Sequence, residues 1–217
     1  MKKQVADLAK NLPIYYPIHN FLTRRRYLRE YAQWEQSGHP VPPPHLAKQK
    51  VLRSIAEEFG YKVLVETGTY YGAMVEALLH EFDAIYTIEL SEYLHRLATR
   101  RFKSSRHVYV IQGDSATKLP EILAGLACPT LFWLDGHYSA GVTARGAEDT
   151  PILQELNHIL SGKDLGHSIV IDDARDFGVE PGYPTLEQVT SFVKERLPGH
   201  EIRISGDSIQ ITPKRRG

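Results

Sequence analysis

The chain has 217 residues, with 26 Lys and Arg residues balanced by 26 Asp and Glu residues, and 42% of it is apolar. This length allows one α/β domain with an additional segment and is short for two full domains. The balanced charge argues against binding to nucleic acid or to an anionic membrane surface.

Cysteine content and hydropathy narrow the class further. Cys128 is the single cysteine, which excludes a disulfide framework or a cysteine-based zinc site within one chain, and we expect it to be a small buried residue. The first residues, MKKQVADLAKNLP, have no apolar run after the lysines and do not resemble a signal peptide. Because no apolar stretch approaches about 20 residues, we expect no transmembrane segment and a cytoplasmic protein.

Residues 1–45 differ in composition from the rest, and we expect them to form an N-terminal helical cap beside a main domain of residues 46–217. RRRYLREYAQWEQ predicts a helix, and HPVPPPH ends it because proline cannot continue a helix. Residues 13–34 are rich in aromatic side chains, which either stack on a sugar or planar ring or pack within the protein or a homodimer. The basic run Arg24–Arg26 is expected to be a solvated face, with binding of an anionic substrate or a phospholipid surface as the alternative.

The main domain alternates between strands and helices after an amphipathic helix predicted over residues 45–60. The predicted strands cover residues 62–66, 84–89, 107–112, 130–135 and 168–173. The predicted helices between them cover residues 73–82, 92–102, 116–125 and 150–161. Nearly continuous apolar strands that alternate with helices predict a parallel sheet covered on both faces.

The end of the chain changes this pattern. Residues 185–197 predict an amphipathic helix, and residues 201–212 predict two short strands around a Gly-Asp turn. The fold class we expect is therefore α/β, with a Rossmann-like, doubly wound sheet of seven strands that is mostly parallel and ends in an antiparallel C-terminal hairpin.

The first predicted strand ends in VETGTYYG, where Glu66 and Thr67 precede Gly68 and Gly72. Ligands of α/β sheets bind at this edge, and glycines let the backbone approach them closely. The spacing E-x-G-x-x-x-G is neither the G-x-G-x-x-G dinucleotide fingerprint nor a P-loop, which counts against a nicotinamide-dependent oxidoreductase. A glutamate here suits an ammonium or sulfonium group better than a pyrophosphate.

The next two strands also end in polar residues. Glu89 follows Gly68 by 21 positions, close to the offset of about 20 at which a carboxylate binds ribose hydroxyls. The third strand runs into Gly113, Asp114 and Ser115, which suit the edge of an adenine. The alternatives are a strand cap with a tight turn at Glu66 and Gly68, a solvated acid at Glu89 and a helix N-cap at Asp114.

In this order, and with the terminal hairpin, these features resemble the class I S-adenosylmethionine-dependent methyltransferases over residues 50–213. That fold has a seven-stranded sheet with an antiparallel last strand. The resemblance implies S-adenosylmethionine as cofactor. The cofactor-binding residues it implies are Glu66, Thr67, Gly68, Gly72, Glu89, Gly113, Asp114, Ser115 and Asp135.

Three aspartates end the fourth and fifth predicted strands: Asp135, Asp172 and Asp173. We expect them to converge at the same edge of the sheet, where like charges repel unless a cation is shared. Oxygen ligands alone suit Mg²⁺ or Ca²⁺ and not zinc.

The aspartates resemble those of metal-dependent O-methyltransferases of the catechol and macrolide-sugar types, and the sequence DGH resembles a D-G-x-H signature of bacterial methyltransferases. The resemblance implies Mg²⁺ at Asp135, Asp172 and Asp173, with Asp135 and His137 catalytic and His137 accepting the proton of the substrate. In metal-free relatives the aspartate after the fourth strand binds cofactor or substrate. The alternatives for His137 are that it orients the cofactor or the substrate, or that it makes a structural hydrogen bond.

The loop GHYSAGVTARGAEDT is long for a connection, and loops of this length beside a site often act as lids. Tyr138 and Arg145 are its candidate substrate contacts, with Arg145 binding an anionic group. A solvated loop is the alternative.

The sequence thus predicts an S-adenosylmethionine-dependent O-methyltransferase, Mg²⁺-assisted, that acts on a hydroxyl of a sugar, a glycan or another small natural product. A catechol-like phenol is the alternative acceptor, and a non-catalytic S-adenosylmethionine-binding protein is the alternative class. The expected partners are a small-molecule or glycan acceptor and a second copy in a homodimer.

Overall fold

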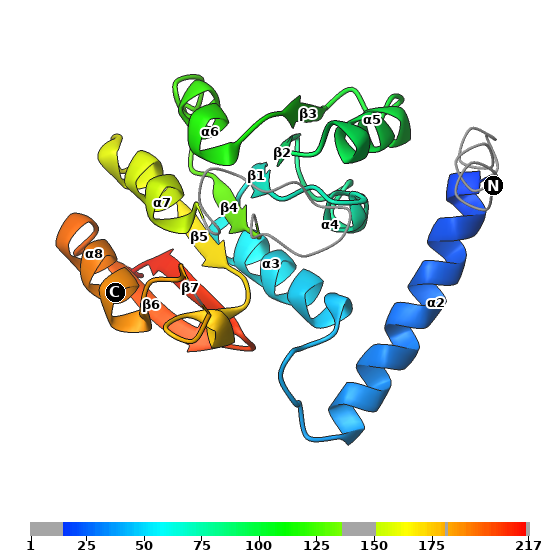
Figure 1. Cartoon of the computed structure of the whole chain (residues 1–217), viewed down its shortest axis with the longest axis horizontal. Helices are drawn as coiled ribbons and strands as arrows, with labels where there is room; N and C mark the ends of the chain where they lie inside the picture. Colours follow the sequence, from blue (N-terminus) through cyan, green and yellow to red (C-terminus); the bar gives the residue numbers. More distant parts are fainter. Residues whose placement is uncertain (1–14, 136–150, 181, 216–217) are drawn as a thin grey trace. The chain divides into compact units, whose positions relative to one another are not determined.

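The computed structural model describes residues 15–135, 151–180 and 182–215 (Figure 1). The chain divides into two compact units, residues 1–50 and 51–217. The division between residues 45 and 46 that the sequence suggests stays a prediction. Among the described helices, none is both long and apolar enough to cross a membrane.

The N-terminal unit contains helix α2 (Tyr15–Gln36) and the start of α3 (His45–Phe59). The Tyr27 ring stacks on His45 with 4.8 Å between centroids, and the Lys50 ammonium lies 3.8 Å from the centroid of Tyr31. Trp34 donates a hydrogen bond of 2.7 Å to the carbonyl of Pro40. These three aromatic side chains therefore stabilise the unit itself. Arg24–Arg26 are exposed, as expected for a solvated face.

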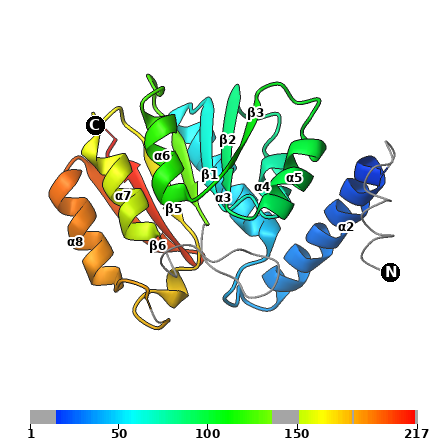
Figure 2. The same ribbon diagram turned by 45° about the horizontal axis from the view of Figure 1, so that its top comes forward.

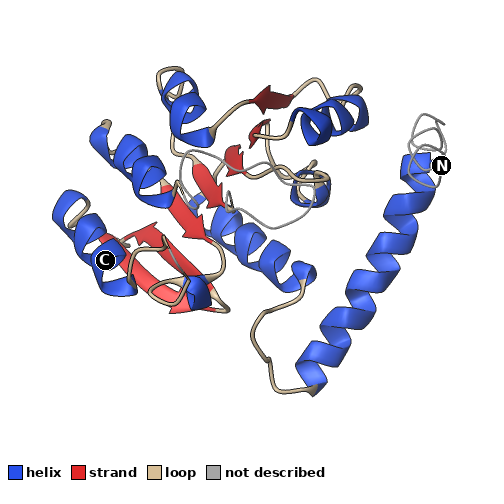
Figure 3. Cartoon of the chain, viewed as in Figure 1, coloured by secondary structure: helices blue, strands red, loops and turns tan. Residues whose placement is uncertain are grey.

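The second unit is built on one seven-stranded sheet in the order β3-β2-β1-β4-β5-β7-β6 (Figure 3). Its strands are β1 (Val63–Thr67), β2 (Ala84–Glu89), β3 (Val108–Gln112), β4 (Leu131–Leu134), β5 (Ser168–Ile171), β6 (His200–Ser205) and β7 (Ser208–Pro213). The first five strands pair in parallel, whereas β7 pairs antiparallel with both β5 and β6. This topology confirms the predicted fold class, including the terminal hairpin.

Helices cover both faces of this sheet (Figure 2). They are α4 (Ala73–Ala77), α5 (Glu92–Arg101), α6 (Ser115–Leu123), α7 (Ile152–Ser161) and α8 (Leu186–Arg196), with a 3₁₀ turn, η1 (Ala174–Asp176), after β5. One core cluster joins α6, α7 and α8 to the sheet, and another joins α4, α5 and the later part of α3 to it. The strands β1, β4 and β5 are buried at nearly every position, which is why they are rich in apolar residues.

Two local expectations were wrong. The helix predicted over residues 73–82 ends at Ala77, although Leu78 and Phe82 remain buried in the core, because the chain turns there to enter β2. Cys128 is exposed between α6 and β4 and is not a buried residue.

Gly72, just before α4, gives a direct test of how this turn packs against Phe102. Gly72 has φ +73°, and a Cβ there would lie 2.6 Å from the Phe102 ring, whereas Gly60 has φ +70° and open space around it. We expect Gly60→Ala to lower the free energy of unfolding by about 1 kcal/mol for the left-handed backbone alone. Gly72→Ala should cost a further 1–3 kcal/mol, roughly, because the ring must move.

Urea unfolding of both variants checks this expectation. Equal losses at the two positions would show that the Phe102 contact does not restrict Gly72.

Candidate active site

The carboxyl ends of the parallel strands form one edge, and the backbone ladder continues one step beyond them. The bonds run from Gly68 N to Ile88 O at 3.0 Å, from Gly113 N to Glu89 O at 3.0 Å, from Asp135 N to Thr67 O at 3.1 Å and from Asp172 N to Leu134 O at 3.0 Å. The residues that follow each strand are therefore fixed relative to the neighbouring strand. This is how five separate pieces of sequence come to share one site.

The glycine turn after β1 holds the acid at the end of β2. Gly68 and Tyr70 adopt positive φ angles of 85° and 50°, which turns the Tyr70 N–H toward Glu89. The Glu89 carboxylate accepts a bond of 2.7 Å from this N–H and one of 2.8 Å from the N–H of Ser91. Burial raises the pKa of Glu89, and these backbone donors oppose the rise.

Glu66 lies inside this edge and is only 2% exposed. Its carboxylate accepts a hydrogen bond from the Thr87 hydroxyl, which is itself bonded to the hydroxyl of Thr69. Burial raises the pKa of Glu66 to about 8, with smaller contributions from the nearby Asp135 and Glu89 charges. A cation bound at this edge would favour the ionised form.

The turn after β3 starts helix α6. Asp114 is the N-cap of α6, because its Oδ1 accepts a bond of 2.9 Å from the N–H of Ala116. Gly113 has φ +141°, and a Cβ there would lie 2.9 Å from the Lys118 side chain. A side chain at Gly113 would therefore be strained, and Ser115 is the first residue of the helix.

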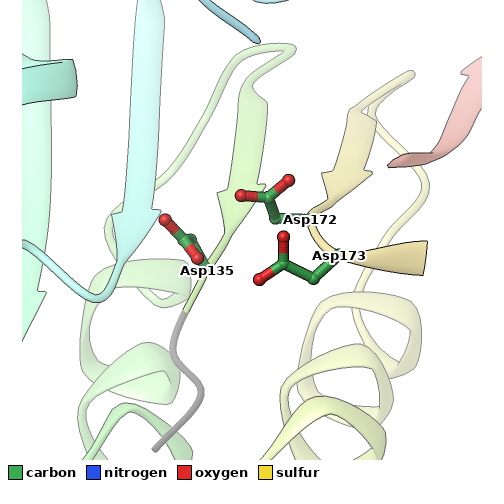
Figure 4. Close-up of side chains that lie close together, drawn as sticks. All are labelled: Asp135, Asp172 and Asp173. Atoms are coloured by element: carbon green, nitrogen blue, oxygen red, sulfur yellow. The ribbon is translucent and has the colours of Figure 1, made fainter. Parts of the chain in front are cut away.

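The three aspartates converge as predicted, and one carboxylate oxygen of each lies within 4.8 Å of the corresponding oxygens of the other two (Figure 4). Asp135 follows β4 and is partly exposed, whereas Asp172 and Asp173 follow β5 and are 4% and 5% exposed. Asp173 has φ +54°, a left-handed conformation that lets successive residues both face the cluster.

The donor set fits a hard divalent cation. Mg²⁺ binds oxygens at 2.0–2.1 Å and Ca²⁺ at 2.3–2.6 Å, so oxygens on opposite sides of the ion lie about 4.1 Å or about 4.9 Å apart. One oxygen of each aspartate lies within 4.8 Å of the others, so a small approach of the carboxylates would let all three bind one Mg²⁺ or Ca²⁺ ion. Asp135, Asp172 and Asp173 are the residues that would hold the ion.

Arg175, which the sequence did not point to, flanks this cluster. Arg175, in η1, donates a hydrogen bond of 2.9 Å to Asp173 and another to the buried carboxylate of Asp207, in the β6–β7 turn. The Arg175 N–H and the Ala174 N–H bond to the Asp207 side chain and carbonyl at 3.0 Å and 2.8 Å. The terminal hairpin thus fixes the segment that carries Asp172 and Asp173.

Two further residues near this edge were also missed. Burial and the charges of Asp176, Asp173 and Asp135 raise the pKa of Tyr183, so its phenol stays protonated. Glu155, on α7, is buried close to Thr67 and Ser115. Both side chains are brought here by the tertiary fold.

His137, Tyr138 and Arg145 lie outside the described residues.

No protein-family model and no curated protein matches the chain. Solved structures do match: an SAH-bound methyltransferase, PaMTH1, from Podospora anserina has a TM-score of 0.58 and 17% identity, over 87% of this chain and 88% of that one. The O-methyltransferase from Bacillus cereus in complex with SAH gives 0.58 and 16% over 87% and 91%. The O-methyltransferase TomG from Streptomyces achromogenes in complex with SAM gives 0.55 and 16% over 86% and 88%. The chain therefore has the class I methyltransferase fold.

The buried Glu66 predicts how stability depends on pH. Its folded pKa of about 8 exceeds the ordinary value of 4.5, so the folded state keeps a proton that the unfolded state releases between these values. Stability must therefore fall as pH rises through this window, by up to about 1.4 kcal/mol per pH unit for one such group. Glu66→Gln should flatten this dependence.

Urea unfolding at pH 5 to 8 measures both slopes. Glu187→Gln, at an exposed position on α8, is the matched control and should follow the wild type. Parallel curves for the wild type and Glu66→Gln would contradict the assignment.

Proposed function

We propose that the chain is an S-adenosylmethionine-dependent O-methyltransferase. The position of the candidate residues along one edge of the sheet supports this proposal best. The glycine turn, Glu89 and Asp114 follow β1, β2 and β3 in succession, on the same edge of the sheet as the aspartate cluster. A cofactor site and a metal-binding acceptor site would then lie side by side.

Each part of the cofactor would have a partner at this edge. Glu66, Thr67, Gly68 and Gly72 would surround its methionine part, where carboxylates favour the ammonium and sulfonium charges. Glu89 would accept hydrogen bonds from the ribose hydroxyls, since two backbone N–H groups already hold its carboxylate in place. Gly113, Asp114 and Ser115 would line the adenine.

Bound S-adenosylmethionine would supply its methyl group to the acceptor oxygen, and the bond from the methyl carbon to sulfur would break, so that the products would be SAH and a methyl ether. The hydroxyl proton must leave to a base, for which His137 remains our candidate. The protein mainly aligns the oxygen with the methyl group and excludes water. Asp135 follows β4, which lies between β1 and β5, and would orient the acceptor.

A divalent cation, Mg²⁺ by our proposal, would be held by Asp135, Asp172 and Asp173. When bound, it lowers the pKa of a coordinated hydroxyl and so supplies a better nucleophile. Arg175 limits the repulsion in this cluster through its ion pair with Asp173 and keeps that carboxylate in position.

The acceptor we favour is a hydroxyl of a sugar, a glycan or another small natural product, and a catechol-like phenol is the alternative. The structural neighbours from Bacillus cereus and Streptomyces achromogenes, both O-methyltransferases by name, support oxygen as the methylated atom. Tyr138 and Arg145 remain candidate substrate contacts. A non-catalytic S-adenosylmethionine-binding protein is the rival class, against which the clustered aspartates argue. A homodimer in the cytoplasm remains our expectation.

Calorimetric titration with SAH tests the cofactor assignment. We expect micromolar binding by the wild type, and binding at least about tenfold weaker by Glu89→Gln, because charge-assisted hydrogen bonds to the ribose are lost. Glu92→Gln, an exposed position one turn away, is the control and should bind as the wild type does. Lack of SAH binding by the wild type, or binding of NADH instead, would refute the proposal.

Titration with Mn²⁺, followed by paramagnetic resonance, tests the metal site. The wild type should bind one ion per chain and Asp172→Asn at least about tenfold less tightly, while the control Asp83→Asn, at an exposed position, stays unchanged. Without metal, Asp172→Asn should be at least as stable as the wild type, because one repelling charge is removed. Methyl transfer that persists in EDTA and in Asp172→Asn would contradict metal assistance.

A further inference from the structure

Glu155 occupies a core position on helix α7. The residues Ile152, Leu156 and Ile159 form the buried face of this helix, and Glu155 lies on the same face with 1% of its surface exposed. An acidic side chain at such a position is costly, because burial disfavours its charged form and removes its water. Its presence therefore calls for an explanation beyond the packing of α7.

The neighbours of Glu155 all belong to the proposed cofactor edge. The hydroxyls of Ser115 and Thr67 approach its carboxyl, and Asp114 and Asp135 act on it electrostatically. Thr67 ends β1, whereas Ser115 begins α6, which packs beside α7 in the core that covers this face of the sheet. Glu155 thus lies between two segments that are far apart in the sequence and that the proposed cofactor would bridge.

The contacts around Glu155 are incomplete in the described part of the chain. Glu155 Oε1 and Thr67 Oγ1 are both buried and have no hydrogen-bond partner there at normal geometry. Burial raises the pKa of Glu155 to about 7, the two hydroxyls oppose this rise, and the two aspartates add to it. A buried acid with an unsatisfied oxygen destabilises the fold, whereas an apolar side chain of similar size would not.

We propose that Glu155 is a positioning residue of the cofactor site. Its carboxyl lies beside the hydroxyls of Thr67 and Ser115, and this contact sets the distance between the glycine turn after β1 and the Asp114–Ser115 turn at the start of α6. This inference rests on the proposed function, because that distance matters only if one ligand binds to both turns. Binding sites depend on such supporting contacts, since an error of about 1 Å in geometry can weaken them by up to a hundredfold.

A positioning role and a purely structural role predict opposite effects on stability. If Glu155 serves the fold, its replacement lowers both the unfolding temperature and the affinity for SAH. If it serves the site, an apolar replacement leaves the unfolding temperature unchanged or raises it, while the affinity for SAH falls.

The experiment compares Glu155→Met, Glu155→Gln and Glu155→Asp by SAH calorimetry and by thermal unfolding without ligand. We expect Glu155→Met to bind SAH at least about tenfold more weakly at an equal or higher unfolding temperature. Glu155→Gln keeps an acceptor oxygen at the same place and should bind within about threefold of the wild type. Glu155→Asp withdraws the carboxyl by one methylene and should lose affinity despite keeping the charge. Gln154→Met, exposed on the same turn, is the control.

The outcomes separate this inference from the proposed function. A wild type that does not bind SAH refutes the proposed function and this inference with it. A wild type that binds SAH, with Glu155→Met binding equally well, overturns this inference alone. If Glu155→Met does not fold, the SAH affinities of the other two variants decide. A higher affinity for Glu155→Gln than for Glu155→Asp supports the positioning role. Wild-type affinity for Glu155→Asp together with a reduced affinity for Glu155→Gln overturns it in favour of a role for the charge.

Discussion

Carboxyl groups crowd at one edge of the sheet, where burial makes the negative charge of several of them costly. The group consists of Glu66, Glu89, Asp114, Asp135, Glu155, Asp172 and Asp173. Burial raises the pKa of Glu66, Glu89 and Glu155, whereas a carboxylate paired with a cation shows the opposite shift. On one flank, Arg175 pairs with Asp173. A sulfonium, an ammonium and a divalent ion are all cations, so the proposed ligands have the sign of charge that this edge favours. Binding of a cationic ligand therefore favours ionisation of these acids, and their ionisation in turn favours a cationic ligand.

Much of this edge could be predicted from sequence, because its parts are local. A buried parallel strand is a short apolar run, and the residue after the run lies at the carboxyl edge whatever the strand order. Glu89, Asp135 and Asp172 could therefore be assigned to one edge before any contact was known. The antiparallel hairpin was also a local signal, a Gly-Asp turn between two short strands. The prediction that the aspartates converge is confirmed by their separation.

The remaining features depend on contacts between distant segments. In the sequence, Glu155 looks like one more polar residue of an amphipathic helix, and only the packing of α7 beside α6 places it next to Ser115. Arg175 and Asp207 are 32 residues apart, and no periodicity relates them. Leu78 and Phe82 continue an apolar helical pattern, but the need to enter β2 ends α4 earlier. In each case a tertiary requirement overrides the local preference.

The contact between Arg175 and Asp207 affects the order in which parts of the protein fold during synthesis. Domains form as their segments emerge during synthesis, with the N-terminal parts first. The strands β1 to β5 can pair as they appear, but β7 must insert beside β5 after β6 has been made. Until then, Arg175 lacks its buried partner and the corner that carries Asp172 and Asp173 is not held. A nascent chain can thus have most of its sheet and still lack the contacts that hold the corner with Asp172 and Asp173.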